Sequence, residues 1–335
     1  MSRTTGDGDG PVERKVQVTG GSTYTVSIPK TWADGHGVGS GSSVYLYPFD
    51  DRLIIAHPDG DGTFRRARIN VEAVGRENLS GRIGAAYAAG SDEIVVESDT
   101  RFSTSDRRAA SRAFTDLVGT EIATETEQEL TAKVLLDSAE ISLDGTIEQI
   151  RRIALSMHEN AIEAVVDGDS EPQPEHIISR DDEVDRLFAL VSRQFYRILT
   201  DIREVNQLKT DRRTAFTRFR TARQLERIAD HAERIATVAD EQTEPPDPDL
   251  GAEFEALATD ARRVVRTALD GNGGEAMLRR DDVVGRLDDL DRELYDRQSE
   301  TLYLHGRVLE SIRRTAEYGG NIAEIITLSE MTERS

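Results

Sequence analysis

Residues 225–236 read LERIADHAERIA, and this stretch decides the fold of the second half of the chain. Its apolar residues recur every three or four positions, which predicts an amphipathic helix with one buried stripe. Three acids, Glu226, Asp230 and Glu233, follow one another along a flank of that stripe. The helix is therefore expected to present carboxylates at the border of a buried seam.

The same period extends on both sides of this stretch, from Asp144 to the C-terminus. It is interrupted five times, at 167–176, near 206–211, at 242–249, at 271–274 and near 299–303. Five breaks predict six helices. Ser179, followed three residues later by Asp182, predicts a capping box at the start of the second helix. The segments SRDDEVDRL at 179–187 and RRDDVVGRL at 279–287 match each other, which indicates an internal repeat of two three-helix units.

The helix before LERIADHAERIA carries a second acid pair, Asp181 and Asp185, one turn apart at the edge of its own apolar stripe. Antiparallel packing around a loop near 206–211 would bring this pair level with Glu226 and Asp230. Four carboxylates would repel one another unless a cation or protons compensated, and oxygen ligands suit Mg, Mn, Fe or Zn. The alternative is a salt-bridged rim built with nearby arginines: Arg186, Arg223, Arg227 and Arg234.

LERIADHAERIA and the preceding DDEVDRL at 181–187 resemble two motifs of the PhoU family of phosphate-signalling regulators. Two such repeats would cover 144–331, as 144–241 and 250–331. The resemblance implies two three-helix bundles side by side, acidic motifs that bind metal, and a role in restraining phosphate uptake or its signalling, without catalysis. On the first repeat it implies four metal ligands: Asp181, Asp185, Glu226 and Asp230.

The second repeat departs from this pattern. Gly285 stands where the first repeat has Asp185, and IRRTAEYGGNIA at 312–323 puts Arg313 at the Glu226 position and Glu317 at that of Asp230. An arginine replaces a ligand by a fixed cation. We therefore expect about one metal site, in the first repeat.

The N-terminal region predicts a small β module at 12–58, with a helical turn after Pro29. Its four short strands are expected at 14–18, 23–28, 43–47 and 52–56. The stretch 14–56 resembles the AbrB/SpoVT swapped-hairpin DNA-binding domain, in which a strand ending in I-P-K leads to a short helix, a glycine turn and two more strands.

That resemblance implies two interleaved chains, because about 45 residues are too few to bury a core alone. A homodimer or a higher oligomer is therefore expected. Arg14, Lys15 and Lys30 are the only bases in 14–51, and we interpret them as contacts to DNA phosphates. The alternative is that Arg14 and Lys15 guard an edge strand.

Residues 64–140 predict a third kind of structure, an α/β connecting module. Short β-like runs alternate there with two helical patterns near 77–89 and 105–118. The strands are expected at 68–71, 93–97, 121–125 and 129–136.

The amino-acid composition excludes several classes of function. Of the 335 residues, 63 are acids and 42 are Lys or Arg, so the net charge of −21 excludes a generally basic surface, and any contact with DNA must be local. The absence of cysteine excludes thiol catalysis and Cys-ligated zinc, and no run of about 18 apolar residues occurs. We expect a cytoplasmic protein without membrane insertion. Only four bases are lysines, and an acid-rich, lysine-poor surface is typical of a halophile.

These features together predict a multi-domain regulator of phosphate uptake: a swapped-hairpin β module, an α/β module and an all-α six-helix PhoU-like bundle. The alternative is a PhoU-type subunit that binds a phosphate transporter ATPase or a kinase, its N-terminal module serving only to dimerise. A carboxylate-bridged metal oxidase is a third class, but such sites usually need Glu-x-x-His pairs, and none is positioned here.

Overall fold

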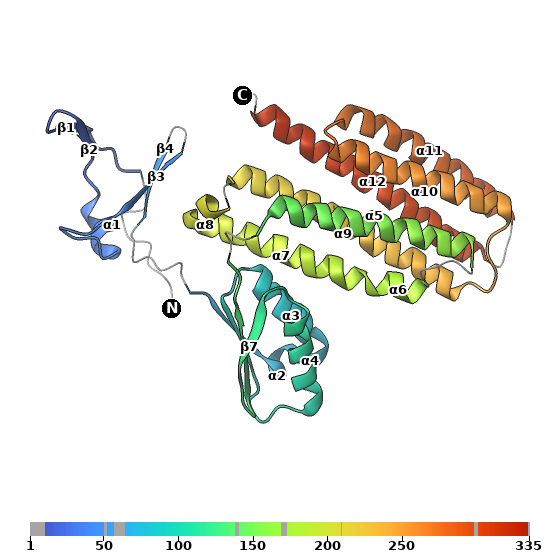
Figure 1. The fold of residues 1–335 in the computed structure, drawn as a ribbon, viewed down its shortest axis with the longest axis horizontal. Coiled ribbons are helices and arrows are strands. Elements are labelled where there is room, and N and C mark those ends of the chain that lie inside the picture. Colours follow the sequence, from blue (N-terminus) through green and yellow to red (C-terminus); the bar gives the residue numbers. More distant parts are fainter. Residues whose placement is uncertain are drawn as a thin grey trace. The chain divides into compact units, whose positions relative to one another are not determined.

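The structure, a computed structural model, describes residues 11–49, 52–56, 64–137, 141–168, 173–208, 210–297 and 301–333. The chain divides into two compact units, Met1–Thr63 and Phe64–Ser335. The ends of the predicted β and α/β modules, 57–58 and 138–140, lie outside the described residues. The predicted fold class is confirmed: strand hairpins, then a mixed α/β region, then a helical bundle (Figure 1).

The first unit contains two antiparallel hairpins and one short helix. The hairpins pair β1 (Gln17–Thr19) with β2 (Thr23–Thr25), and β3 (Tyr45–Phe49) with β4 (Arg52–Ala56), and α1 (Lys30–Gly35) lies between them in sequence. Gly20 and Gly21 make the first turn with φ values of 67° and 82°, which only glycine adopts without cost.

The described residues of this unit form no hydrophobic core. None of its described side chains is buried, and Tyr24 is 78% exposed. Further apolar side chains are exposed on the strands and beside them: Val12, Val16, Val18, Val26, Tyr45, Leu46 and Leu53. So many exposed apolar groups on a module of this size need a covering surface.

The second unit begins with a four-stranded sheet in the order β5-β6-β8-β7, in which β5 and β6 are parallel and the other pairs antiparallel. Two helices, α3 and α4, pack on the sheet, and their fully buried Tyr87 and Phe114 form part of its core. The elements are β5 (Arg66–Asn70), α2 (Val71–Val74), α3 (Arg76–Ala88), β6 (Glu93–Glu97), α4 (Thr104–Thr115), β7 (Thr120–Glu125) and β8 (Glu129–Val134).

Eight helices follow, six long and two short, in the part of the chain that the structure describes. They are α5 (Leu143–Val166), α6 (Pro174–Ser179), α7 (Asp181–Thr200), α8 (Ile202–Gln207), α9 (Arg212–Glu241), α10 (Pro248–Leu269), α11 (Gly273–Arg297) and α12 (Leu302–Glu333). The long helices pack as two groups of three, α5 with α7 and α9, and α10 with α11 and α12. The groups contact each other through α9 and α12 and through α5 and α10 (Figure 1).

The predicted capping box at Ser179 is wrong. The hydroxyl of Ser179 donates to the carbonyl of His176, and the helical run begins earlier, at Pro174. Arg180, between α6 and α7, keeps helical angles of φ −77° and ψ −17°. Helical geometry is therefore continuous up to Asp181. Carbonyl groups of the preceding turn can accept hydrogen bonds from the backbone N–H groups at the start of α7, so its first turn does not need a side-chain cap.

Helix α7 joins the helical groups to the sheet. The guanidinium of Arg193, only 3% exposed, donates to the carbonyls of Tyr87 and Ser91 at 3.1 and 2.6 Å. Arg197, one turn later, forms ion pairs with Asp92 and Glu204. A single rigid helix therefore carries the contact with the sheet at one end and the predicted acid pair at the other.

Candidate functional site

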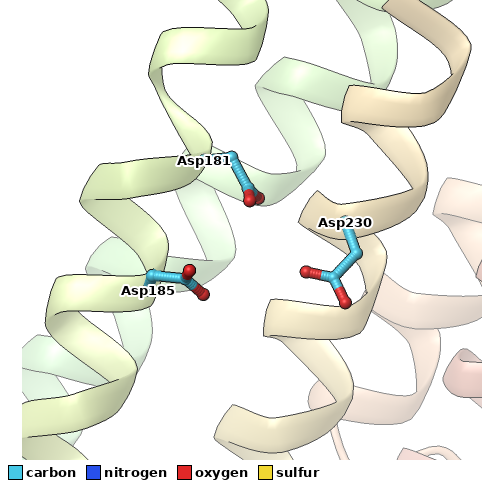
Figure 2. A group of neighbouring side chains, drawn as sticks. All are labelled: Asp181, Asp185 and Asp230. Atoms are coloured by element: carbon cyan, nitrogen blue, oxygen red, sulfur yellow. The ribbon is translucent and has the colours of Figure 1, made fainter. Parts of the chain in front are cut away.

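Two helices bring three carboxylates together. Asp181 and Asp185 lie one turn apart on α7, Asp230 lies on α9, and all three point into the space between these helices (Figure 2). One carboxylate oxygen of each residue lies within 4.8 Å of those of the other two. We call these three residues the carboxylate cluster.

Apolar packing fixes this geometry. Val184 on α7 and Ile228 and Ala229 on α9 are fully buried beside the cluster, so the two helices cannot rotate without exposing them. Asp185 follows Val184 and Asp230 follows Ala229, while Asp181 lies one turn before Asp185, so all three side chains lie at the edge of the seam, as the periodicity predicts.

The cluster is electrostatically unfavourable when its carboxylates are charged. Burial, reinforced by Asp185 and Asp230, raises the pKa of Asp181 to about 8. Partial burial and the charge of Asp230 also raise the pKa of Asp185, whose side chain is more open to solvent. Asp181 therefore holds a proton near neutral pH unless a cation replaces it.

Three arginines of the alternative salt-bridged rim, Arg223, Arg227 and Arg234, oppose the rise in the pKa of Asp230 through their charge, but none of them forms an ion pair with it in the described segments. Arg186 forms its ion pair with Asp116, and Arg234 contacts the ring of His231. The described parts of the chain offer no ion pair to any of the three aspartates, and Oδ1 of Asp181 is buried there without a hydrogen-bond partner. An orphaned carboxylate oxygen beside two further carboxylates fits a hard or borderline cation, so Asp181, Asp185 and Asp230 would hold such a metal. Bound there, it would neutralise their charge and tie α7 to α9.

Glu226, the fourth predicted ligand, is held apart from the cluster. It is 7% exposed, and its Oε1 accepts a hydrogen bond from Arg223 at 2.7 Å. Burial, followed by the charge of Asp230, raises its pKa to about 7. Its Oε2 has no partner within the described segments, so Glu226 faces the seam but does not share the oxygen group of the three aspartates.

Glu233 lies on the predicted acidic flank but is not among the predicted ligands. Its charge contributes to the raised pKa values of Asp181 and Asp185, although its oxygens do not belong to the carboxylate cluster. Its position three residues after Asp230 on the same acidic flank is the signal that could have identified it.

The second repeat has a different arrangement. Arg313, at the position equivalent to Glu226, forms an ion pair with Asp288 at 2.7 Å. Glu317, equivalent to Asp230, pairs with Arg314 at 2.9 Å. Among the described residues only the first repeat assembles a group of carboxylates close enough to share a cation.

The three predicted DNA-binding bases all lie on the exposed surface of the first unit. Arg14 lines a groove of about 580 Å³ together with the segment 26–29 and with Thr31 and Trp32, which follow Lys30 in the sequence. Lys15 lies outside that groove. None of the three bases forms an ion pair with another described residue, so their charges are available to an anion.

Two three-helix units joined through their long helices, with one carboxylate cluster, define a repeated helical-bundle protein with a candidate cation site. Residues 147–239 match the family model described as the PhoU domain. A curated relative, the phosphate-specific transport system accessory protein PhoU homolog of Synechocystis sp., is 30% identical over 170 residues, which are 46% of this chain and 73% of the relative. The chain belongs to the PhoU family.

Two further comparisons concern a solved structure and the N-terminal module. A solved structure of PhoU from Pseudomonas aeruginosa is 18% identical, with a TM-score of 0.41 over 57% of this chain and 96% of that chain. Residues 17–62 match the family model described as antidote-toxin recognition MazE, bacterial antitoxin. The first unit is thus similar to a small antitoxin domain.

None of the helices in the described segments combines the length and the apolar character needed to span a membrane.

Proposed function

We propose that this protein regulates phosphate uptake or phosphate signalling, binding DNA as a dimer through its first unit and a metal through the carboxylate cluster. The observation that carries the proposal is the presence, in one chain, of a PhoU domain and a module similar to an antitoxin domain. Membership of the PhoU family supports the phosphate role, since the curated relative is named for a phosphate-specific transport system.

The exposed surface of the first unit supports the DNA and dimer parts of the proposal. Its apolar side chains need a partner surface, and a second copy would supply one. Two copies would also double the number of these bases, bringing Arg14, Lys15 and Lys30 to six cations. Residues 1–63 carry eight acids against five Lys and Arg, so the contact with DNA would be a local one.

The metal would have a regulatory role, and we assign no catalytic residue. A divalent or trivalent ion, Mg, Mn, Fe or Zn, would be held by Asp181, Asp185 and Asp230, with Glu226 or Glu233 as a further candidate. Because α7 also contacts the sheet through Arg193, occupancy of the cluster would set the position of this helix for both regions.

The DNA part is tested by fluorescence anisotropy of the full-length protein with fragments upstream of phosphate-transport genes, over a range of salt concentrations. We expect affinity to fall with salt. Each of Arg14→Ala, Lys15→Ala and Lys30→Ala should lower the salt slope by about one if the replaced base touches a DNA phosphate. Lys133→Ala, which removes an exposed lysine from β8 in the second unit, is the matched control and should change nothing.

Absence of DNA binding even at low salt would contradict this proposal. It would favour the alternative in which the first unit only dimerises and the bundle binds a phosphate transporter ATPase or a kinase.

A protein that binds DNA and regulates phosphate uptake would act in the cytoplasm, which is the location that we propose.

A further inference from the structure

A polar cleft of about 810 Å³ lies where α9, α11 and α12 meet. Four arginines line it: Arg227, Arg234, Arg280 and Arg314. Three carboxylates, those of Asp230, Glu310 and Glu317, line it as well, so the lining keeps a net positive charge although the whole chain carries −21.

Two of these arginines are neutralised and two are not. Arg314 pairs with Glu310 and Glu317 at 2.8 and 2.9 Å, and Arg280 pairs with Asp281 at 2.6 Å. Arg227 and Arg234 form no ion pair within the ranges that the structure describes.

Arg227 and Arg234 are placed to act on one ligand. They are seven residues apart on α9, which is about 10 Å along the helix axis and puts both on one face. Two arginine side chains can close that distance around an ion a few ångströms wide, and a guanidinium offers paired N–H donors that match an oxyanion.

Neutral groups contact these two guanidinium groups, which also act on the charge of Asp230 without forming an ion pair with it in the described segments. Arg227 lies over the ring of Tyr318, 5.8 Å from its centroid. Nε2 of His231, a side chain that is only 6% exposed, lies 3.5 Å from both Nη1 of Arg234 and the hydroxyl of Tyr318. The cleft therefore presents two guanidinium groups that have no ion-pair partner among the described residues, together with the side chain of Tyr318.

We propose that this cleft binds a tetrahedral oxyanion, inorganic phosphate, between Arg227 and Arg234. The anion class follows from the arginines, and the choice of phosphate among oxyanions rests on the proposed function. Asp230 also lines the cleft, and its carboxylate opposes an anion, so Asp230→Asn should tighten phosphate binding in metal-free protein.

The test is calorimetric titration of inorganic phosphate into full-length, chelator-treated protein at fixed ionic strength, with ³¹P line broadening as a second readout. Arg227→Gln and Arg234→Gln should each weaken binding about tenfold or more, and the double variant should abolish it. Arg227→Lys should bind with intermediate affinity, because it keeps the charge and loses the paired donors. Arg279→Gln, on α11 and paired with Glu275 outside the cleft, is the matched control and should bind as the parent protein does.

Two results would overturn the inference: no phosphate binding by the parent protein in either readout, or equal binding by the double variant. A clear preference for sulfate over phosphate would overturn the choice of ligand. Since the protein is free of metal and DNA in these titrations, a failure of the proposed DNA or metal function would leave them unchanged.

Discussion

Folding disfavours the ionised form of the Asp181 carboxyl group. Its pKa is raised to about 8, above an unfolded value of about 3.9, mainly by burial and then by Asp185 and Asp230. A group with a raised folded-state pKa contributes its stability fully below the unfolded pKa and loses it as the pH rises through the folded pKa. The metal-free protein should therefore lose stability between about pH 4 and pH 8 on account of this group.

We predict that Asp181→Asn makes the metal-free protein more stable at pH 8, by about 1 kcal/mol once solvent screening of a half-buried group is allowed for. The advantage should shrink toward pH 4, where Asp181 is protonated in both states. Urea unfolding of both proteins in chelator at several pH values measures the difference. A constant difference across this pH range would show that Asp181 ionises normally.

The carboxylate cluster, which only the first repeat has among the described residues, predicts a difference in metal content between the two repeats. Asp230→Asn removes one carboxylate from the cluster and should lower bound Mg, Mn, Fe or Zn by elemental analysis. Glu317→Gln, at the equivalent position of the second repeat, removes a carboxylate already paired with Arg314 and should leave the content unchanged. Equal metal loss in both variants, or a metal-free parent protein, would contradict a single site in the first repeat.

At the scale of elements, the contact between α10 and α12 depends on one glycine. A Cβ on Gly319 would lie 2.8 Å from Cγ1 of Val264 and 3.0 Å from the backbone nitrogen of Val265, too close for either to stay in place. The small residue lets the two helices approach through their backbones.

We predict that Gly319→Ala destabilises the protein by about 1–3 kcal/mol, because the added methyl forces α10 and α12 apart. Gly285→Ala, in the middle of α11 with no atom within 4 Å of the new Cβ, is the control and should stabilise by up to about 1 kcal/mol through helix propensity. Thermal unfolding of the two variants tests the contrast. Similar melting temperatures for both would contradict a close backbone contact at Gly319.

At the scale of the whole molecule, the first unit should control assembly. Its described side chains include none that is buried, so it needs a second copy to form a core. Deleting Met1–Thr63 removes this unit at its boundary and should lower the number of subunits measured by light scattering. An unchanged subunit number would move the oligomer contact to the second unit.

The excess of acids over the whole chain predicts that the protein comes from a halophile. A net charge of −21 repels itself at low ionic strength, so stability that rises steadily with added potassium chloride would support it. It stays a prediction, since it concerns the environment of the protein and not its fold.

Local sequence patterns predicted the long helices and the order of the strands, but not the short helices α2, α6 and α8, so the six helices expected after Asp144 are eight in the described part of the chain. The strands expected at 93–97 and 52–56 occur at these residues, and the two helices expected in the α/β module lie within a few residues of α3 and α4. Local period and turn residues carry this information, because helix and strand formation depend mainly on neighbours along the chain. The predicted capping box at Ser179 is wrong because its signal comes from four neighbouring residues only. The preceding turn of α6 makes a cap unnecessary, and this pattern does not include that turn.

The tertiary structure alone decided which polar groups meet. Spacing placed four acids at the border of one seam, but only packing of α7 against α9 brings Asp181, Asp185 and Asp230 within reach of one cation while Arg223 holds Glu226 aside. The pairing of α9 with α12 likewise places Arg227 and Arg234 in the lining of a cleft between these helices. A helix fixes the direction of each side chain around its own axis, whereas the rotation of one helix against another is set by packing between segments far apart in the chain.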